Sequence, residues 1–93
     1  MAHFLVEVEL TAKPTEDEVL EQRAFLEKIT KERSLLLAGV LPERPGKGMG
    51  IVKAPSIEAA KAIYNEAPLY KKGIIGWTLT EIQLTYGLAV GLE

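Results

Sequence analysis

The sequence has no cysteine and a single histidine, His3, among its 93 residues. Without cysteine there is no disulfide, no thiolate nucleophile and no cysteine-based metal or iron–sulfur site. One histidine leaves carboxylates as the remaining metal ligands, and too few of them converge to predict a magnesium or calcium site. The sequence therefore predicts no metal and no cofactor.

Long apolar runs and an excess of positive charge are also missing. No apolar stretch approaches the roughly 20 residues that cross a bilayer, and residues 1–4 lack the pattern of a secretory leader. We therefore expect a cytoplasmic protein without a membrane partner. The 13 acidic and 11 basic residues are mixed along the chain, so no basic stripe predicts nucleic-acid binding. Leu92 and Glu93 are interpreted as a remnant of an expression vector about as readily as native sequence, and the domain is assigned to residues 1–91.

What is present indicates one globular domain, because 47% of the residues are apolar and 26% are charged. Residues 3–11 alternate between two faces, which predicts a half-buried strand. One face carries Glu7 and Glu9, and the other carries Phe4, Val6, Val8 and Leu10. Thr15 and Glu18 have capping-box spacing and predict a helix to about residue 32, with a buried stripe of Val19, Leu20, Phe25, Leu26 and Ile29.

The second half repeats the pattern. Residues 34–40 and 49–53 predict two strands joined by a turn-rich loop at residues 41–48. Ser56 is placed to cap a second helix, which Pro68 ends. Residues 74–86 predict a long fourth strand. The apolar phase of this strand changes between Leu79 and Ile82, which predicts either a bulge or burial on both faces.

This order of elements is the split βαβ pattern (βαββαβ) of an α+β, ferredoxin-like fold. It predicts a four-stranded antiparallel sheet with two helices on one face. The other face stays bare, and apolar residues such as Leu5 make it too hydrophobic for water. We therefore expect a homodimer through the sheet face, and whether such dimers assemble further stays open.

Several short runs resemble a known family: LLLAG at residues 35–39, PSIEAA at 55–60, APLY at 67–70 and the β segment after Gly73. They resemble YciI-like (YCII-related) proteins, and residues 55–70 are equally similar to muconolactone isomerase. Both groups belong to the dimeric α/β-barrel superfamily, so the resemblance implies two ferredoxin-like subunits packed sheet against sheet. YciI-like proteins are typified by a histidine on the first helix and an aspartate before a proline. Gln22 and Ala67 stand at the matching positions, so the acid–base chemistry of that pair is not expected here.

Four ionisable residues are weak candidates for a catalytic base, namely His3, Glu7, Glu9 and Glu81. Glu7 and Glu9 are neighbours on one strand face, and Glu81 would join them if the fourth strand turned it to the same side. The structural interpretation is favoured for all of them: an exposed histidine near the chain start, and carboxylates that are solvated or paired across strands.

A ligand pocket between the helices and the sheet is the other candidate site. Its predicted lining is aromatic with a few polar groups, which suits a small organic ligand: Gln22, Arg23, Tyr64, Tyr70 and Trp77. Aromatic residues at these spacings also serve as core or dimer contacts. The loop at residues 42–50 carries two cations among glycines and could hold an anion, although it lacks the P-loop pattern and a plain hairpin is favoured.

Three functions stay open at this point. The first is a homodimeric, non-enzymatic or catalytically degenerate domain that binds a small molecule. The second is an isomerase resembling muconolactone isomerase, which would move a proton on a small lactone or organic acid with a carboxylate as base. The third is a structural or regulatory homo-oligomer.

Overall fold

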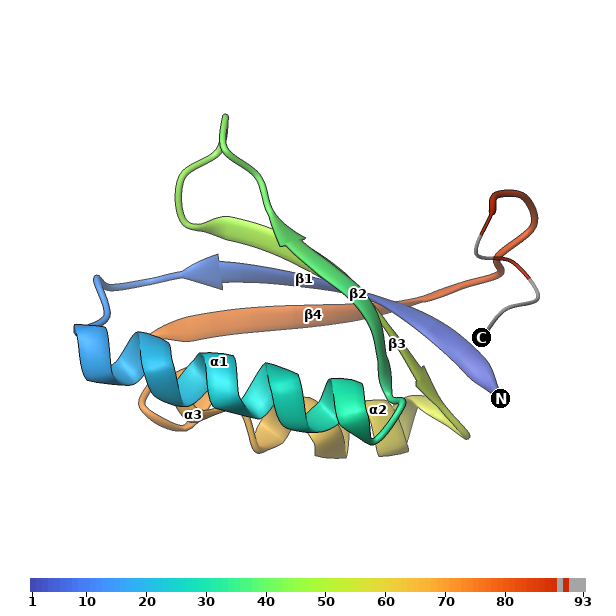
Figure 1. Ribbon diagram of the computed structural model, residues 1–93, viewed down its shortest axis with the longest axis horizontal. Coiled ribbons are helices and arrows are strands. Elements are labelled where there is room, and N and C mark those ends of the chain that lie inside the picture. The colour runs from blue at the N-terminus through green and yellow to red at the C-terminus, as the bar shows by residue number, and fades with distance from the viewer. Residues whose placement is uncertain (89, 91–93) are drawn as a thin grey trace.

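The computed structural model of the chain describes residues 1–88 and 90, so Leu92 and Glu93 lie outside the described residues. The strands form one antiparallel sheet in the order β2-β3-β1-β4. All helices of the described part cover the same face of this sheet (Figure 1). The elements are β1 (Ala2–Leu10), α1 (Glu16–Lys31), β2 (Leu35–Val40), β3 (Lys47–Ala54), α2 (Ile57–Asn65), α3 (Pro68–Lys71) and β4 (Ile75–Ile82). The predicted ferredoxin-like fold is confirmed.

The core lies between the sheet and the helices, as the alternation in β1 predicts. Phe4 and Val6 point toward the helices and are 2% and 1% exposed, whereas Glu7 and Glu9 are exposed on the other face. The buried cluster continues through Phe25, Ile29, Leu35, Val52, Ala54, Ala60, Tyr64 and Ala67. Burial of these apolar side chains is the main force that holds the helices against the sheet.

Both predicted helix caps are formed. The Thr15 hydroxyl accepts the Glu18 N–H at 3.2 Å, and the Glu18 carboxylate accepts the Thr15 N–H at 2.8 Å. The Ser56 hydroxyl accepts the Ala59 N–H at 3.1 Å at the start of α2. The predicted buried stripe of α1 is wrong at Leu20 and Val19, which are 57% and 38% exposed. Leu20 lies outside the i, i+3, i+4, i+7 stripe that begins at Gln22.

The end of the chain differs from the prediction. The fourth strand ends at Ile82 instead of continuing to residue 86, because its neighbour β1 begins at Ala2 and pairs His3 with Ile82, leaving no strand beyond that point to bond. Of the two alternatives predicted for this strand, the bulge is wrong, since the register of β4 with β1 is continuous and the shift lies in β2, between Leu35 and Leu37. The short helix α3 was not predicted.

The sheet face opposite the helices carries no covering element in the described part of the chain (Figure 1). The strand registers place six large, mostly apolar side chains on it: His3, Leu5, Leu37, Met49, Ile51 and Ile82. We call these six residues the bare-face patch. Leu37 is 46% exposed. His3 is half-buried within β1 rather than a loosely held terminal side chain, so the favoured expectation for it was wrong.

Candidate ligand-binding cleft

A cleft of about 600 Å³ lies between the first half of α1 and the β2–β3 end of the sheet. Helix α1 contributes Val19, Gln22, Arg23 and Leu26 to one wall, and the inner strands contribute Val6 and Val8 with Gly48 and Gly50 as a floor. The outer wall is formed by residues 38–42 and 45–47 of the β2–β3 hairpin, and Tyr64, Leu69 and Ile75 close the inner end. The volume is within the usual range for small-molecule sites, roughly 300–1,000 Å³.

Two glycines in β3 keep this space open. Gly48 and Gly50 face the helices, in the same alternation as Val52 and Ala54, and both are buried. A Cβ atom on Gly48 would lie 2.9 Å from the Gly39 carbonyl oxygen, and one on Gly50 would lie 3.0 Å from that of Leu37. Gly48 and Gly50 therefore leave the floor of the cleft without side chains, and a larger residue at either position would fill the cleft.

The hairpin that forms the outer wall is held in place by backbone hydrogen bonds. The Leu10 N–H donates to the Gly46 carbonyl at 2.7 Å, and the Lys47 N–H donates to the Arg44 carbonyl at 3.0 Å. Gly46 has a φ of 84°, a conformation that glycine adopts without steric cost. The hairpin rises beyond the rest of the sheet (Figure 1), and its base borders the mouth of the cleft.

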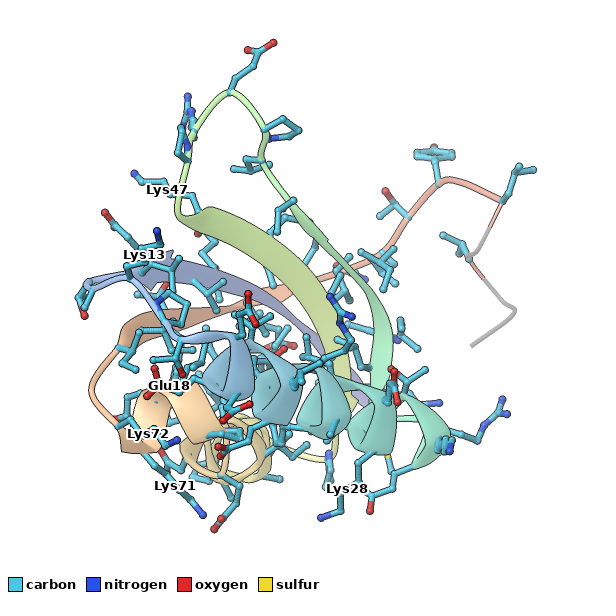
Figure 2. All side chains as sticks on the ribbon, turned by 60° about the vertical axis from the view of Figure 1, so that its left-hand side comes forward. Lys13, Glu18, Lys28, Lys47, Lys71 and Lys72 are labelled. Atoms are coloured by element: carbon cyan, nitrogen blue, oxygen red, sulfur yellow. The ribbon has the colours of Figure 1, made fainter. Side chains whose placement is uncertain are left out.

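Gln22 joins α1 to α3 at the inner end of the cleft. Its side-chain oxygen accepts the Leu69 N–H at 3.2 Å. Helix α3 begins with Pro68, which has no N–H, and its N-cap residue Ala67 makes no side-chain cap, so Gln22 takes the place of a capping side chain. Near this bond, Lys72 contacts Glu21 at 3.2 Å and Glu18 at 3.8 Å (Figure 2). Gln22 therefore stabilises the junction between α1 and the start of α3, and Ala67, the N-cap residue of α3, belongs to the same junction.

The predicted aromatic cluster exists, but only part of it reaches the cleft. Tyr64 packs edge-on against Phe25, with ring centroids 6.1 Å apart, and lies 6.3 Å from Trp77. Tyr70 and Trp77 are 5.3 Å apart and do not line the cleft. The Trp77 indole N–H is buried without a hydrogen-bond partner in the described residues. Burial raises the pKa of Tyr64 to about 12, so its phenol stays neutral at physiological pH.

None of the candidate bases lines the cleft in the described part of the chain. Glu7 and Glu9 are exposed on the opposite face of the sheet, and His3 shares that face. Glu81 is the register partner of Phe4, so it points to the helix side and does not converge with Glu7 and Glu9. The expected convergence is wrong because the register of β4 puts its odd-numbered residues opposite the even-numbered residues of β1.

Gln22, Arg23 and Tyr64 from the predicted set meet in the cleft, whereas the contribution of the hairpin was missed as part of the same site. The loop at residues 42–50 was considered as a separate anion-binding loop. The missed signal is the spacing of Gly46, Gly48 and Gly50. Glycines at every second position of a strand lie on one face, and on a helix-facing side they leave unfilled space.

The described residues contain no group of three or more His, Cys, Asp or Glu side chains placed to hold a metal ion. Among the helices of residues 1–88 and 90, none has the length and apolar character that crossing a membrane requires.

No family model matches the sequence. No curated protein is detectably similar to it. Solved structures do share its fold, at low sequence identity. One is the 5-chloro-2-hydroxyhydroquinone dehydrochlorinase TftG from Burkholderia phenoliruptrix, solved in complex with 2,5-dihydroxybenzoquinone, with a TM-score of 0.65 and 15% identity over 91% of this chain and 95% of that chain.

A second is the structural-genomics protein YJCS, with a TM-score of 0.58 and 16% identity over 91% of this chain and all of that chain. Identities this low support the common ferredoxin-like fold and no closer relation.

Proposed function

We propose that the protein is a homodimeric, small-molecule-binding member of the dimeric α/β-barrel superfamily, whose ligand occupies the cleft between α1 and the hairpin. The observation that carries the proposal is the cleft itself. It is about 600 Å³ in volume, mostly apolar, floored by two glycines and bordered by few polar side chains, which is the usual make-up of a ligand site. TftG, which shares the fold, was solved with a small ring compound, and this supports the same size of ligand.

The binding proposal is tested with 1-naphthalenemethanol, a neutral, mostly apolar ring compound, followed by ¹⁵N–¹H NMR. We expect saturable shifts of the Gly48 and Gly50 amides, because these two residues form the floor of the cleft. The variant Ala38→Phe fills the cleft from its outer wall, since Ala38 is exposed, lines the cleft and lies beside Gly50. It should abolish the shifts.

The matched control is Ala62→Phe, which makes the same change at an exposed position of α2 outside the cleft. It should leave the shifts intact. If neither this compound nor its carboxylate analogue 1-naphthoate moves a cleft amide in the unaltered protein, or if Ala38→Phe leaves the titration unchanged, the cleft is not the binding site and the proposal is wrong.

A second copy of the chain is the proposed cover of the bare-face patch. Leu5, Leu37 and Ile51 lie on this face, and the segment after β4 extends the apolar surface, with Tyr86 95% exposed and Leu88 98% exposed. This segment borders a second cavity that is also lined by Leu37 and Ile51, so the two apolar surfaces are continuous. An apolar surface of this extent is rarely left in water.

Light scattering tests the dimer. We expect the unaltered protein to have twice the chain mass at micromolar concentration, and Leu5→Lys to convert it to monomers. Leu20→Lys is the matched control, because Leu20 is 57% exposed on α1, away from the patch. If Leu5→Lys fails to fold, Leu37→Lys at the edge strand tests the same interface. A monomeric unaltered protein contradicts this part of the proposal.

The isomerase alternative has less support from the structure. A proton-transferring base has to reach the bound substrate, and neither a carboxylate nor an imidazole lines the cleft in the described residues. Gln22 cannot exchange protons at neutral pH, and its side-chain oxygen is bonded to the Leu69 N–H. We therefore place ligand binding before catalysis.

A further inference from the structure

The charged side chain that faces the cleft is cationic. Arg23 of α1 and Lys47 at the start of β3 are the charged residues of its lining, and no Asp or Glu lines it in the described residues. The alternation of β3 turns the Lys47 side chain to the opposite face of the sheet, with its register partner Glu9, which leaves Arg23 facing the cleft. The remaining ionisable side chain, Tyr64, is 3% exposed and neutral. A ligand in the cleft therefore meets positive charge without a carboxylate in the lining to compensate it.

Arg23 is the stronger of the two candidates for contact with an anion. It makes no ion pair or hydrogen bond with any residue in the described part of the chain. Glu21, two residues earlier on α1, pairs with Lys72, and Glu27, one turn later, does not line the cleft. Lys47 is the register partner of Glu9, so its charge is partly balanced across the strands.

The uncharged polar side chain of the cleft adds to this pattern. The oxygen of Gln22 accepts the Leu69 N–H, and the NH₂ group of the same amide can donate hydrogen bonds to a ligand. Arg23 can only donate as well, through five N–H groups arranged to match a planar anion. Donors on the α1 wall and an apolar floor together select a ligand with an apolar body and an acceptor group that carries negative charge.

Building on the binding function proposed above, we propose that the cleft takes a small organic acid in its anionic form, with its carboxylate or phenolate at Arg23 and its apolar body over Gly48 and Gly50. The bound anion replaces part of its hydration with the guanidinium fork, and its ring excludes water from the floor.

The test compares 1-naphthoate with 1-naphthalenemethanol, which share the ring system and differ in the charged group. Titrations at pH 7, followed by the Gly48 and Gly50 amides, should show 1-naphthoate binding about tenfold more tightly, because hydrogen bonds to a charged group are stronger than neutral ones. The variant Arg23→Gln should remove that difference and leave the affinity for the alcohol within about twofold, since only the carboxylate loses a partner.

Lys28→Gln is the matched control, because it removes one positive charge from the same helix at a side chain that points away from the sheet (Figure 2). It should leave the tenfold preference intact. Equal affinities for the two compounds, or an equal loss of preference in both variants, overturn the anion assignment while leaving the binding function standing. Failure of both compounds to move the cleft amides overturns the binding function itself.

Discussion

Removal of the Gln22 side-chain acceptor tests how α3 is held against α1. In Gln22→Leu, the side chain keeps a similar volume and helix propensity but cannot accept the Leu69 N–H, which is part-buried and bonded at 3.2 Å. The N-cap residue Ala67 offers no substitute. An unpaired, partly buried N–H costs about 1–2 kcal/mol, which lowers the melting temperature of a domain this size by roughly 4–16 °C.

The assay is thermal and urea unfolding at fixed protein concentration, together with amide exchange of Leu69, because dimerisation makes stability depend on concentration. Gln83→Leu is the matched control, since Gln83 is exposed and lies outside every helix and strand, and it should change the unfolding free energy by less than about 0.5 kcal/mol. Gln22→Glu keeps an acceptor and should protect the Leu69 amide as the native residue does. If Gln22→Leu is as stable as the control and the Leu69 amide exchanges at its native rate, the capping role of Gln22 is refuted.

Three further predictions concern packing, capping and pH. Gly48→Ala should destabilise the protein by about 1–3 kcal/mol, since its Cβ would meet the Gly39 oxygen at 2.9 Å, while Gly76→Ala, with no atom within 4 Å, should be neutral or slightly stabilising in urea unfolding. Thr15→Ala should cost about 1 kcal/mol in the same assay through loss of the α1 cap, and an unchanged midpoint would contradict the capping box. The pKa of Tyr64 is about 12 in the folded protein and 10.0 in the unfolded chain, so between these values the folded state retains a proton that the unfolded state loses. The free energy of unfolding should therefore fall as pH rises through this window. Tyr64→Phe should make that fall smaller.

Local patterns in the sequence were enough for most of the fold. The alternation of β1 predicts its two faces because side chains in a strand have a strict period of two. The caps at Thr15 and Ser56 were predicted because each depends on residues three positions apart. The order of the elements then restricts the sheet to few topologies, since split βαβ crossovers are right-handed.

The register of the strands and the contacts of each side chain depend on residues that are distant in the sequence. The predictions failed for features of this kind. The end of β4 depends on where β1 begins, a relation that the local pattern of residues 74–86 does not contain. Glu81 was grouped with Glu7 and Glu9 because all are acidic strand residues, but the register turns Glu81 to the opposite face. Helix α3 depends on a bond from Gln22, 47 residues earlier in the chain, to the Leu69 N–H.

The candidate site divides in the same way. The sequence by itself determined which chemistry is at hand: no cysteine, one histidine, and a glutamine and an alanine where the resemblance implies an acid–base pair. Only the tertiary structure decided that Arg23 and the β3 glycines share one cleft and that the carboxylates of β1 lie on the other face. Residue types are read locally, whereas a cleft exists between elements that are far apart in the chain, so its lining follows from packing and register rather than from any local pattern.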